Sequence, residues 1–175
     1  ILRCDLSLII SPFEMALLTD YFKVDPTLLH HLPFMVNIAQ LATKTLSFEQ
    51  RQHFITIGNF RHAPNWDAVL HLQSLWPKIK AKLPAAECHI YGAYPPPKAT
   101  ALHNPKSGFL IKGWAENALA VMAQSRVCLA PLRFGAGLKG KLLDAMMMQT
   151  PSVTTSIGSE GMSARSSWPG FVANE

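Results

Sequence analysis

The sequence lacks long apolar runs and dense runs of charge. A membrane-spanning helix needs about 20 consecutive apolar residues, and no segment of this 175-residue chain is that long. The formal net charge is +5, but no five basic residues are consecutive, so nucleic acid is not an expected partner. The basic balance suits phosphate-bearing ligands or an anionic membrane surface. Only 15% of the residues are charged, which predicts an exposed face that another domain normally covers.

Cysteine is scarce and is not arranged for metal binding. Cys4, Cys88 and Cys128 are far apart and form no Cys-x-x-Cys pair, so no zinc site is expected. We expect all three to be small buried residues in a reducing compartment such as the cytoplasm. Residues 1–10 lack the features of a signal peptide. Because residue 1 is Ile, we expect the chain to be part of a longer protein.

Short apolar runs alternate with segments of helical periodicity. Such alternation predicts an α/β fold with a Rossmann-like parallel sheet that carries helices on both faces. The expected strands are Leu6–Ser11, Leu28–Leu32, His53–Ile57, Cys88–Tyr91, Phe109–Lys112, Arg126–Leu132, Ser152–Thr155 and Gly170–Ala173. The expected helices are Pro12–Phe22, Asn65–Leu83, Glu116–Gln124 and Gly137–Met148, and residues between Ser156 and Gly170 are expected to form a loop.

Three of the expected strands end in glycine, at Gly58, Gly92 and Gly113. Ligands of parallel sheets bind at the carboxyl ends of the strands. Glycine lets the backbone approach a ligand there, although it also forms ordinary tight turns. Three glycines at one edge modestly favour a binding site.

The most informative stretch is residues 130–155, APLRFGAGLKGKLLDAMMMQTPSVTT. A strand runs through a glycine-rich turn into a helix, whose exposed amides would bind phosphate oxygens. Arg133, Lys139 and Lys141 add positive charge. If the helix starts at Gly137, Asp144 lies two turns later on the same face, where it could accept hydrogen bonds from ribose hydroxyls. A plain ion pair between Lys141 and Asp144 is an equal alternative.

The same stretch also matches most of a phosphate-binding P-loop. Residues 135–141 read Gly-x-x-x-x-Gly-Lys. The motif continues with Ser or Thr, which holds magnesium, but the next residue is Leu142. An NTPase is therefore a disfavoured alternative.

The chain resembles the donor-binding domain of family 4 glycosyltransferases, which have the GT-B fold. The branch with the motif P-L-R-x-G-A-G-x-K-x-K-x-x-E-A-M-x-x-G-x-P-V-V-T-T is the most similar, and this chain has PLRFGAGLKGKLLDAMMMQTPSVTT. IGNFRHAPNWDA at residues 57–68 and IGSEGM at residues 157–162 resemble two further family blocks. The opening residues CDLSLIISPFEMALL resemble the end of the acceptor domain.

The resemblance implies a domain organisation and a donor. Residues 1–37 would be the end of the acceptor domain with its linker, and residues 38–175 the donor-binding domain. The donor would be a UDP- or GDP-type nucleotide sugar, with no further cofactor and no metal. The partners would be this donor, the remaining acceptor domain and an acceptor that is a glycan, a protein or a lipid at a membrane surface. The location would be cytoplasmic, peripheral to the membrane.

The resemblance also assigns residues. In the family's Glu-x7-Glu pair, the position near the donor sugar is Ala136 and the ribose-binding position is Asp144. Backbone amides of Gly137, Leu138 and Lys139, within the turn that begins at Gly135, would approach the diphosphate. Arg133, Lys139 and Lys141 are the candidate catalytic residues, whose positive charges would stabilise the departing diphosphate. The nucleobase would lie near Lys112, Gly113 and Trp114, although a core or interface role for Trp114 is favoured.

Some positions depart from the family. After the turn at Gly58 the family has two phosphate-binding bases, and this chain has Asn59 and Pro64. Gln149 replaces the glycine that usually precedes the last motif strand. The main expectation is a retaining glycosyltransferase that is inactive as this fragment alone. The alternatives are a binding module without transfer activity and, more remotely, a sugar-nucleotide epimerase.

Overall fold

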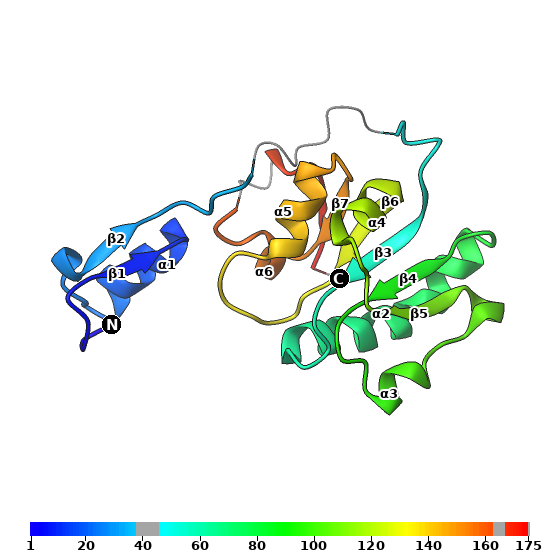
Figure 1. Cartoon of the computed structure of the whole chain (residues 1–175), viewed down its shortest axis with the longest axis horizontal. Coiled ribbons are helices and arrows are strands. Elements are labelled where there is room, and N and C mark those ends of the chain that lie inside the picture. Colours follow the sequence, from blue (N-terminus) through cyan, green and yellow to red (C-terminus); the bar gives the residue numbers. More distant parts are fainter. Residues whose placement is uncertain (38–45, 163–166, 175) are drawn as a thin grey trace.

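The structure, a computed structural model, describes residues 1–37, 46–162 and 167–174. It consists of an N-terminal segment, residues 1–37, and a sheet domain, residues 46–174, and Figure 1 shows the segment at one side of the sheet domain. In the described part of the chain, no helix combines the length and the hydrophobicity needed to cross a membrane.

The N-terminal segment is a small β-α-β unit. Strands β1 (Ser7–Ile9) and β2 (Leu29–His31) pair in parallel. Between them lie α1 (Pro12–Ala16), a π-helical turn η1 (Leu17–Tyr21) and a 3-10 turn η2 (Pro26–Leu28). Ser11 caps α1 by accepting a hydrogen bond from the amide of Glu14 at 3.4 Å. The predicted strand, helix and strand are confirmed, but each regular element is shorter than predicted.

The sheet domain is built on six parallel strands. They are β3 (Gln52–Ile57), β4 (Cys88–Tyr91), β5 (Phe109–Gly113), β6 (Ser125–Ala130), β7 (Ser152–Thr154) and β8 (Gly170–Val172). Their spatial order is β5-β4-β3-β6-β7-β8. This is the 3-2-1-4-5-6 order of a Rossmann sheet, and its direction of growth reverses between β3 and β6. The predicted fold class is confirmed.

Helices cover both faces of this sheet. They are α2 (Ala63–Lys82), α3 (Pro97–Thr100), α4 (Ala118–Gln124), α5 (Gly140–Met147) and α6 (Ser156–Ser159), with a 3-10 turn η4 (Pro105–Ser107). The predicted helix from Gly137 begins only at Gly140, because Gly135 and Gly137 have positive φ angles of 129° and 73° that a right-handed helix excludes. The loop prediction for Ser156 onward was wrong in part, since Thr155 caps α6 by accepting a hydrogen bond from the amide of Gly158.

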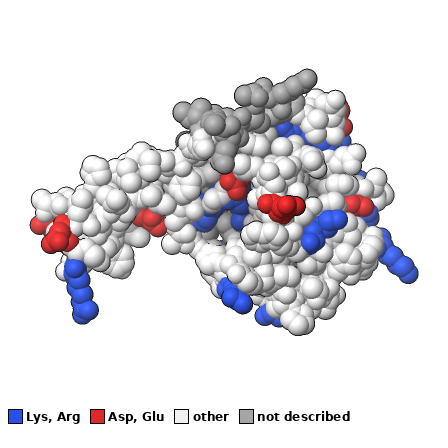
Figure 2. Space-filling view, in the orientation of Figure 1, with Lys and Arg blue, Asp and Glu red and all other residues white. Residues whose placement is uncertain are grey.

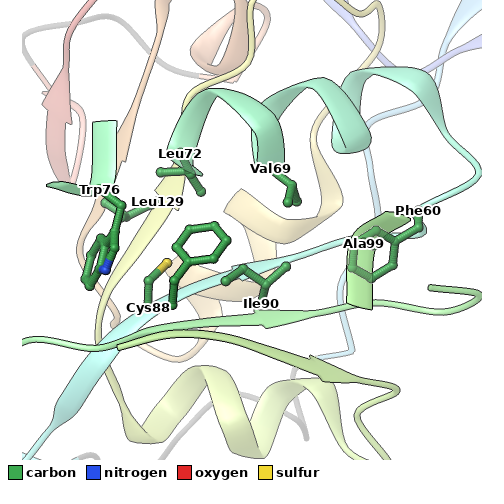
Figure 3. Close-up of a cluster of buried hydrophobic side chains, with 9 residues drawn as sticks. Phe60, Val69, Leu72, Trp76, Cys88, Ile90, Ala99 and Leu129 are labelled. Carbon is green, nitrogen blue, oxygen red and sulfur yellow. The ribbon is translucent and has the colours of Figure 1, made fainter. Parts of the chain in front are cut away.

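Two hydrophobic cores lie on opposite faces of the sheet, because successive side chains of a strand point in opposite directions. The first, beneath α2, contains Phe60, Val69, Leu72, Trp76, Cys88, Ile90, Ala99, Phe109 and Leu129 (Figure 3). The second, beneath α4 and α5, contains Ile55, Met122, Cys128, Ala130, Leu142, Ala145, Met148 and Trp168. On β6, Leu129 belongs to the first core and its two neighbours to the second, as a strand covered on both faces requires.

The cysteines divide between core and surface. Cys88 and Cys128 are fully buried, and burial raises the pKa of each thiol to about 12. Both therefore remain neutral packing groups at physiological pH. Cys4, predicted to be buried, is exposed.

Candidate functional site

A pocket of about 350 Å³ opens at the carboxyl edge of the sheet, between β3 and β6. This is the point where the strand order reverses, and Rossmann-like sheets bind their ligands there. Its walls come from the β3–α2 turn, the start of α4, and the β6–α5 loop with the first turns of α5. The lining residues are Ile57, Gly58, His62, Pro64, Asn65, Ala118, Leu132, Gly135, Ala136, Leu138, Lys139, Gly140, Lys141 and Asp144.

Gly58, Asn65 and Lys141 connect two walls of this pocket. A Cβ at Gly58 would lie only 2.6 Å from the side chain of Asn65, so the turn needs glycine to make room for that amide. The Asn65 side chain donates to the carbonyl of Asn59 at 3.1 Å. It accepts from the Lys141 ammonium at 2.8 Å. Gly58 thus leaves room for the Asn65 side chain, and Asn65 holds the ammonium of Lys141 on α5 in place.

Lys141 and Asp144 lie close in sequence on α5 but do not pair. In the part of the chain that the structure describes, no ion pair joins them and no group donates a hydrogen bond to the Asp144 carboxylate. Burial lowers the pKa of Lys141 to about 8 and raises the pKa of Asp144 above its ordinary value. The ion-pair alternative is therefore not the arrangement observed, and both charges remain available to a ligand in the pocket.

The loop before α5 is shaped by two glycines and one lysine. Gly135 and Gly137 have positive φ angles, which side-chain-bearing residues rarely adopt. The Lys139 ammonium donates to the carbonyl of Gly135 at 3.3 Å and to that of Gly137. Burial lowers its pKa, while the carboxylates of Glu160 and Glu14 oppose that shift. Figure 2 shows basic side chains at the bottom of the hollow between the N-terminal segment and the sheet domain.

Helix α5 begins at the pocket. Lys139 is its N-cap residue, and the first bond of the helix runs from the Leu142 amide to the Lys139 carbonyl at 2.8 Å. The amides of Gly140 and Lys141 precede that bond, so they are N-terminal donors of the kind that attract anions. The predicted shared helical face of Gly137 and Asp144 was wrong, since Gly137 lies in the loop. Leu142, at the P-loop hydroxyl position, is fully buried in the second core.

The pocket gathers some of the predicted residues and omits others. Gly58, Gly135, Ala136, Leu138, Lys139, Lys141 and Asp144 line it, whereas Asn59, Gly113, Trp114, Arg133 and Gly137 do not.

Three of the omitted residues have clear surroundings. Arg133 forms an ion pair with Asp67 on α2, its Nε donating at 2.9 Å, and this bond holds the pKa of Asp67 below its usual value. Gly113 ends β5 at the same edge of the sheet, separated from β3 by β4. Trp114 is 73% exposed, so a place in the core is excluded, while an interface role stays a prediction.

Sequence reasoning missed two polar residues of the pocket. His62 precedes α2 and Asn65 lies in its first turn, and both line the cavity. The signal for Asn65 was present, since Pro64 and Asn65 form part of the P-N-x-D-A block. The block indicated a helix start, but it did not indicate that the Asn65 amide would hold Lys141.

The sequence matches a known family over residues 51–174, and that family is described as glycosyl transferases group 1. The chain belongs to this family. The match covers the sheet domain with every residue that lines the pocket. No curated protein is similar enough in sequence to count as a relative.

Several solved glycosyltransferases share the fold of this group 1 domain. S. aureus TarM, in a complex with fondaparinux, alpha-GlcNAc-glycerol and UDP, has a TM-score of 0.73 at 14% identity, over 99% of this chain and 34% of TarM. A glycosyltransferase from Rickettsia africae has a TM-score of 0.69 at 14% identity, and the match covers 88% of this chain and 45% of that protein. The pneumococcal O-GlcNAc transferase GtfA, in a complex with UDP and GlcNAc, has a TM-score of 0.65 at 16% identity. The match covers 89% of this chain and 31% of GtfA. The chain thus spans less than half the length of each.

Proposed function

We propose that this chain is the donor-binding part of a glycosyltransferase and that the pocket between β3 and β6 holds the nucleoside diphosphate of a nucleotide sugar. The observation that carries the proposal is the convergence of Lys139, Lys141, Asp144 and the start of α5 on one cavity at the switch point of the sheet. Membership of the group 1 family supports it. The UDP complexes of two structurally similar proteins support a UDP-type donor.

The diphosphate would lie against the N-terminus of α5. The amides of Gly140 and Lys141 offer hydrogen bonds, and the two lysines offer charge. Because the pKa of Lys141 is lowered only to about 8, its ammonium is mostly protonated at neutral pH. Asn65 holds that ammonium in place before a ligand arrives. Such prearranged charge stabilises the diphosphate as it leaves the sugar.

Asp144 would bind the ribose. It lies one helical turn after Lys141, lines the same pocket, and has a carboxylate that receives no hydrogen bond from the described part of the chain. A carboxylate can accept from two neighbouring hydroxyls. Asp is one methylene shorter than the Glu of the resembled family, so the ribose would approach α5 more closely.

The remaining predicted residues have secondary places in this proposal. The exposed indole of Trp114 could stack on the nucleobase only if the donor extends along the sheet edge past β4. Arg133 would contribute to catalysis only after leaving Asp67. Ala136, where the resembled family has a carboxylate near the sugar, lines the pocket without a polar group. The donor sugar would therefore take its polar contacts from backbone groups and from the N-terminal segment.

The proposal is tested by calorimetric titration of the 175-residue chain with UDP, GDP and ADP, with and without magnesium. We expect one diphosphate to bind without magnesium, and Asp144→Ala to weaken it by about 1–3 kcal/mol through the lost hydrogen bonds. The matched control is Asp20→Ala, which removes an exposed carboxylate of η1 in the N-terminal segment. Equal affinity of Asp144→Ala and the wild type, or no binding by a chain with an intact near-ultraviolet circular dichroism spectrum, contradicts the proposal.

A binding module without transfer activity is the second candidate. It is favoured by Asn59 and Pro64, which stand where the resembled family carries two phosphate-binding bases. The two candidates separate in the complete protein, by release of nucleoside diphosphate from the donor in the presence of glycan, protein or lipid acceptors. An active transferase releases it in an acceptor-dependent manner, and a binding module retains the intact donor.

A further inference from the structure

A second group of functional side chains lies at the amino edge of the sheet, opposite the pocket. His53 is at the start of β3, Glu87 directly precedes β4, and His89 lies within β4. The two strands pair in parallel, with Phe54 beside Cys88 and Ile55 beside His89. This register brings the three side chains together, although 33 residues separate His53 from Glu87 in the sequence.

The three side chains are close enough together to share one metal ion. The Glu87 carboxylate lies 2.8 Å from His89 Nε2 and 3.3 Å from His53 Nδ1, through the same oxygen. One ligand atom from each residue lies within 4.8 Å of the other two. Ligand atoms bonded to zinc at about 2.0–2.1 Å in a tetrahedron are roughly 3.3 Å apart. A modest rotation of the rings and the carboxylate would place all three around one ion.

The local backbone supports a specific role. His53 has a φ of 60°, in the left-handed region that residues other than glycine seldom occupy. Such conformations cluster where function requires them. The imidazole of His53 stacks on that of His89, with ring centroids 4.1 Å apart and an angle of 21° between the planes.

A polar cavity adjoins the cluster. It measures about 290 Å³ and is lined by both histidines together with Gln50, Gln52, Gln124 and Tyr91, among others. Three protein ligands leave one tetrahedral position free, and the cavity offers space for a water or another small ligand there. The positive charges of Lys112 and Arg126 act on His53 and oppose any cation, so an ion at this site would have to be held by direct coordination.

We propose that His53, Glu87 and His89 form a binding site for a divalent transition metal ion, with zinc as its expected occupant. Two imidazole nitrogens and one carboxylate oxygen are a donor set for zinc, copper or nickel, whereas magnesium and calcium prefer oxygen donors. The ion would join the starts of β3 and β4, about a strand length from the nucleotide pocket. It would hold the edge of the sheet together and does not take part in the proposed sugar transfer.

The test is titration of the metal-free 175-residue chain with Zn²⁺, followed by calorimetry and by the NMR signals of the histidine rings. We expect one ion per chain, a rise in the midpoint of thermal unfolding, and shifts of the His53 and His89 signals as the ring stack opens. Mg²⁺ should produce none of these. The affinity for Zn²⁺ should fall at least about tenfold in His53→Ala and in His89→Ala, since loss of a direct ligand costs no less than loss of an outer partner.

The controls separate this site from adventitious binding. His30→Ala removes an exposed histidine of β2 and should leave the affinity unchanged. Glu87→Gln keeps the size of the side chain and removes its charge, so it should weaken binding without loss of fold. If the folded wild type binds no zinc, or if the His53→Ala and Glu87→Gln variants bind it as the wild type does, the site is excluded. Neither result depends on whether the chain binds a nucleotide.

Discussion

The N-terminal segment and the sheet domain have the same order of strand, helix and strand, but they differ in what they bury. Among residues 1–37 only Ser11 and Leu29 are buried, and Leu8 and Phe22 are 56% and 60% exposed. The sheet domain buries two cores, one on each face. Two paired strands of three residues cannot cover an apolar face, whereas six strands between two helical layers can. The exposed apolar side chains of the segment fit the predicted contact with the rest of an acceptor domain.

The largest expected effect comes from making the same substitution, Phe to Ala, in each of the two regions. Phe109 in the first core is 2% exposed, against 60% for Phe22 in the N-terminal segment. Phe109→Ala should lower the free energy of unfolding by about 3–5 kcal/mol, because it removes buried contacts and leaves a cavity. Phe22→Ala should change it by no more than about 0.5 kcal/mol. Urea denaturation of both variants measures the contrast, and equal losses would show that the segment has a core of its own.

A smaller effect should come from the buried charge at Lys141. Burial lowers the pKa of Lys141 from 10.5 to about 8 in the folded chain. Between these values the unfolded chain binds more protons than the folded one, so the contribution of this group to stability rises with pH from about 8 to about 10.5. The stability of Lys141→Met relative to the wild type should therefore fall by about 2–3 kcal/mol across that range.

Because the variant is compared with the wild type, the contributions of groups that both proteins share cancel from the pH dependence of stability. Cys88, whose pKa burial raises to about 12, opposes the lysine effect but is present in both proteins. Lys23→Met is the matched control, since Lys23 is an exposed lysine of the N-terminal segment. The Lys141→Met difference should vary with pH by more than the Lys23→Met difference. A flat difference for Lys141→Met would mean that the ammonium reaches water in the folded chain.

The sequence predicted the regular parts of the fold well. The strands of the sheet domain follow from short apolar runs, three of which end at glycine, and their parallel pairing follows from the helices between them. The errors lie where tertiary surroundings decide. Apolar character led us to expect Cys4 in a core and Trp114 in a core or an interface, but both side chains are exposed. Periodicity extended α5 back to Gly137, because it does not register the positive φ of Gly137.

The candidate site was predictable only in part. The β6–α5 motif led to Lys139, Lys141 and Asp144, because these residues are close together in the sequence. Asn65 contributes through a contact between residues 76 positions apart, and no local pattern reveals such a contact. The same holds for His53 and Glu87, which only the register of β3 and β4 brings together.

The smallest expected effect concerns the contact that joins the two regions. Gly161, in the sheet domain, has a φ of 73°, and a Cβ there would lie 2.5 Å from the Ser11 hydroxyl. Gly113 has nearly the same φ, 72°, with no atom within 4 Å of its Cβ position. Both Gly→Ala variants incur the strain of a left-handed alanine, about 1 kcal/mol, but only Gly161→Ala also pushes Ser11 away. If the segment is held there, thermal unfolding should show a further loss for Gly161→Ala, and limited proteolysis should cleave its N-terminal segment faster. Identical behaviour of the two variants would mean that this contact does not hold the segment to the sheet domain.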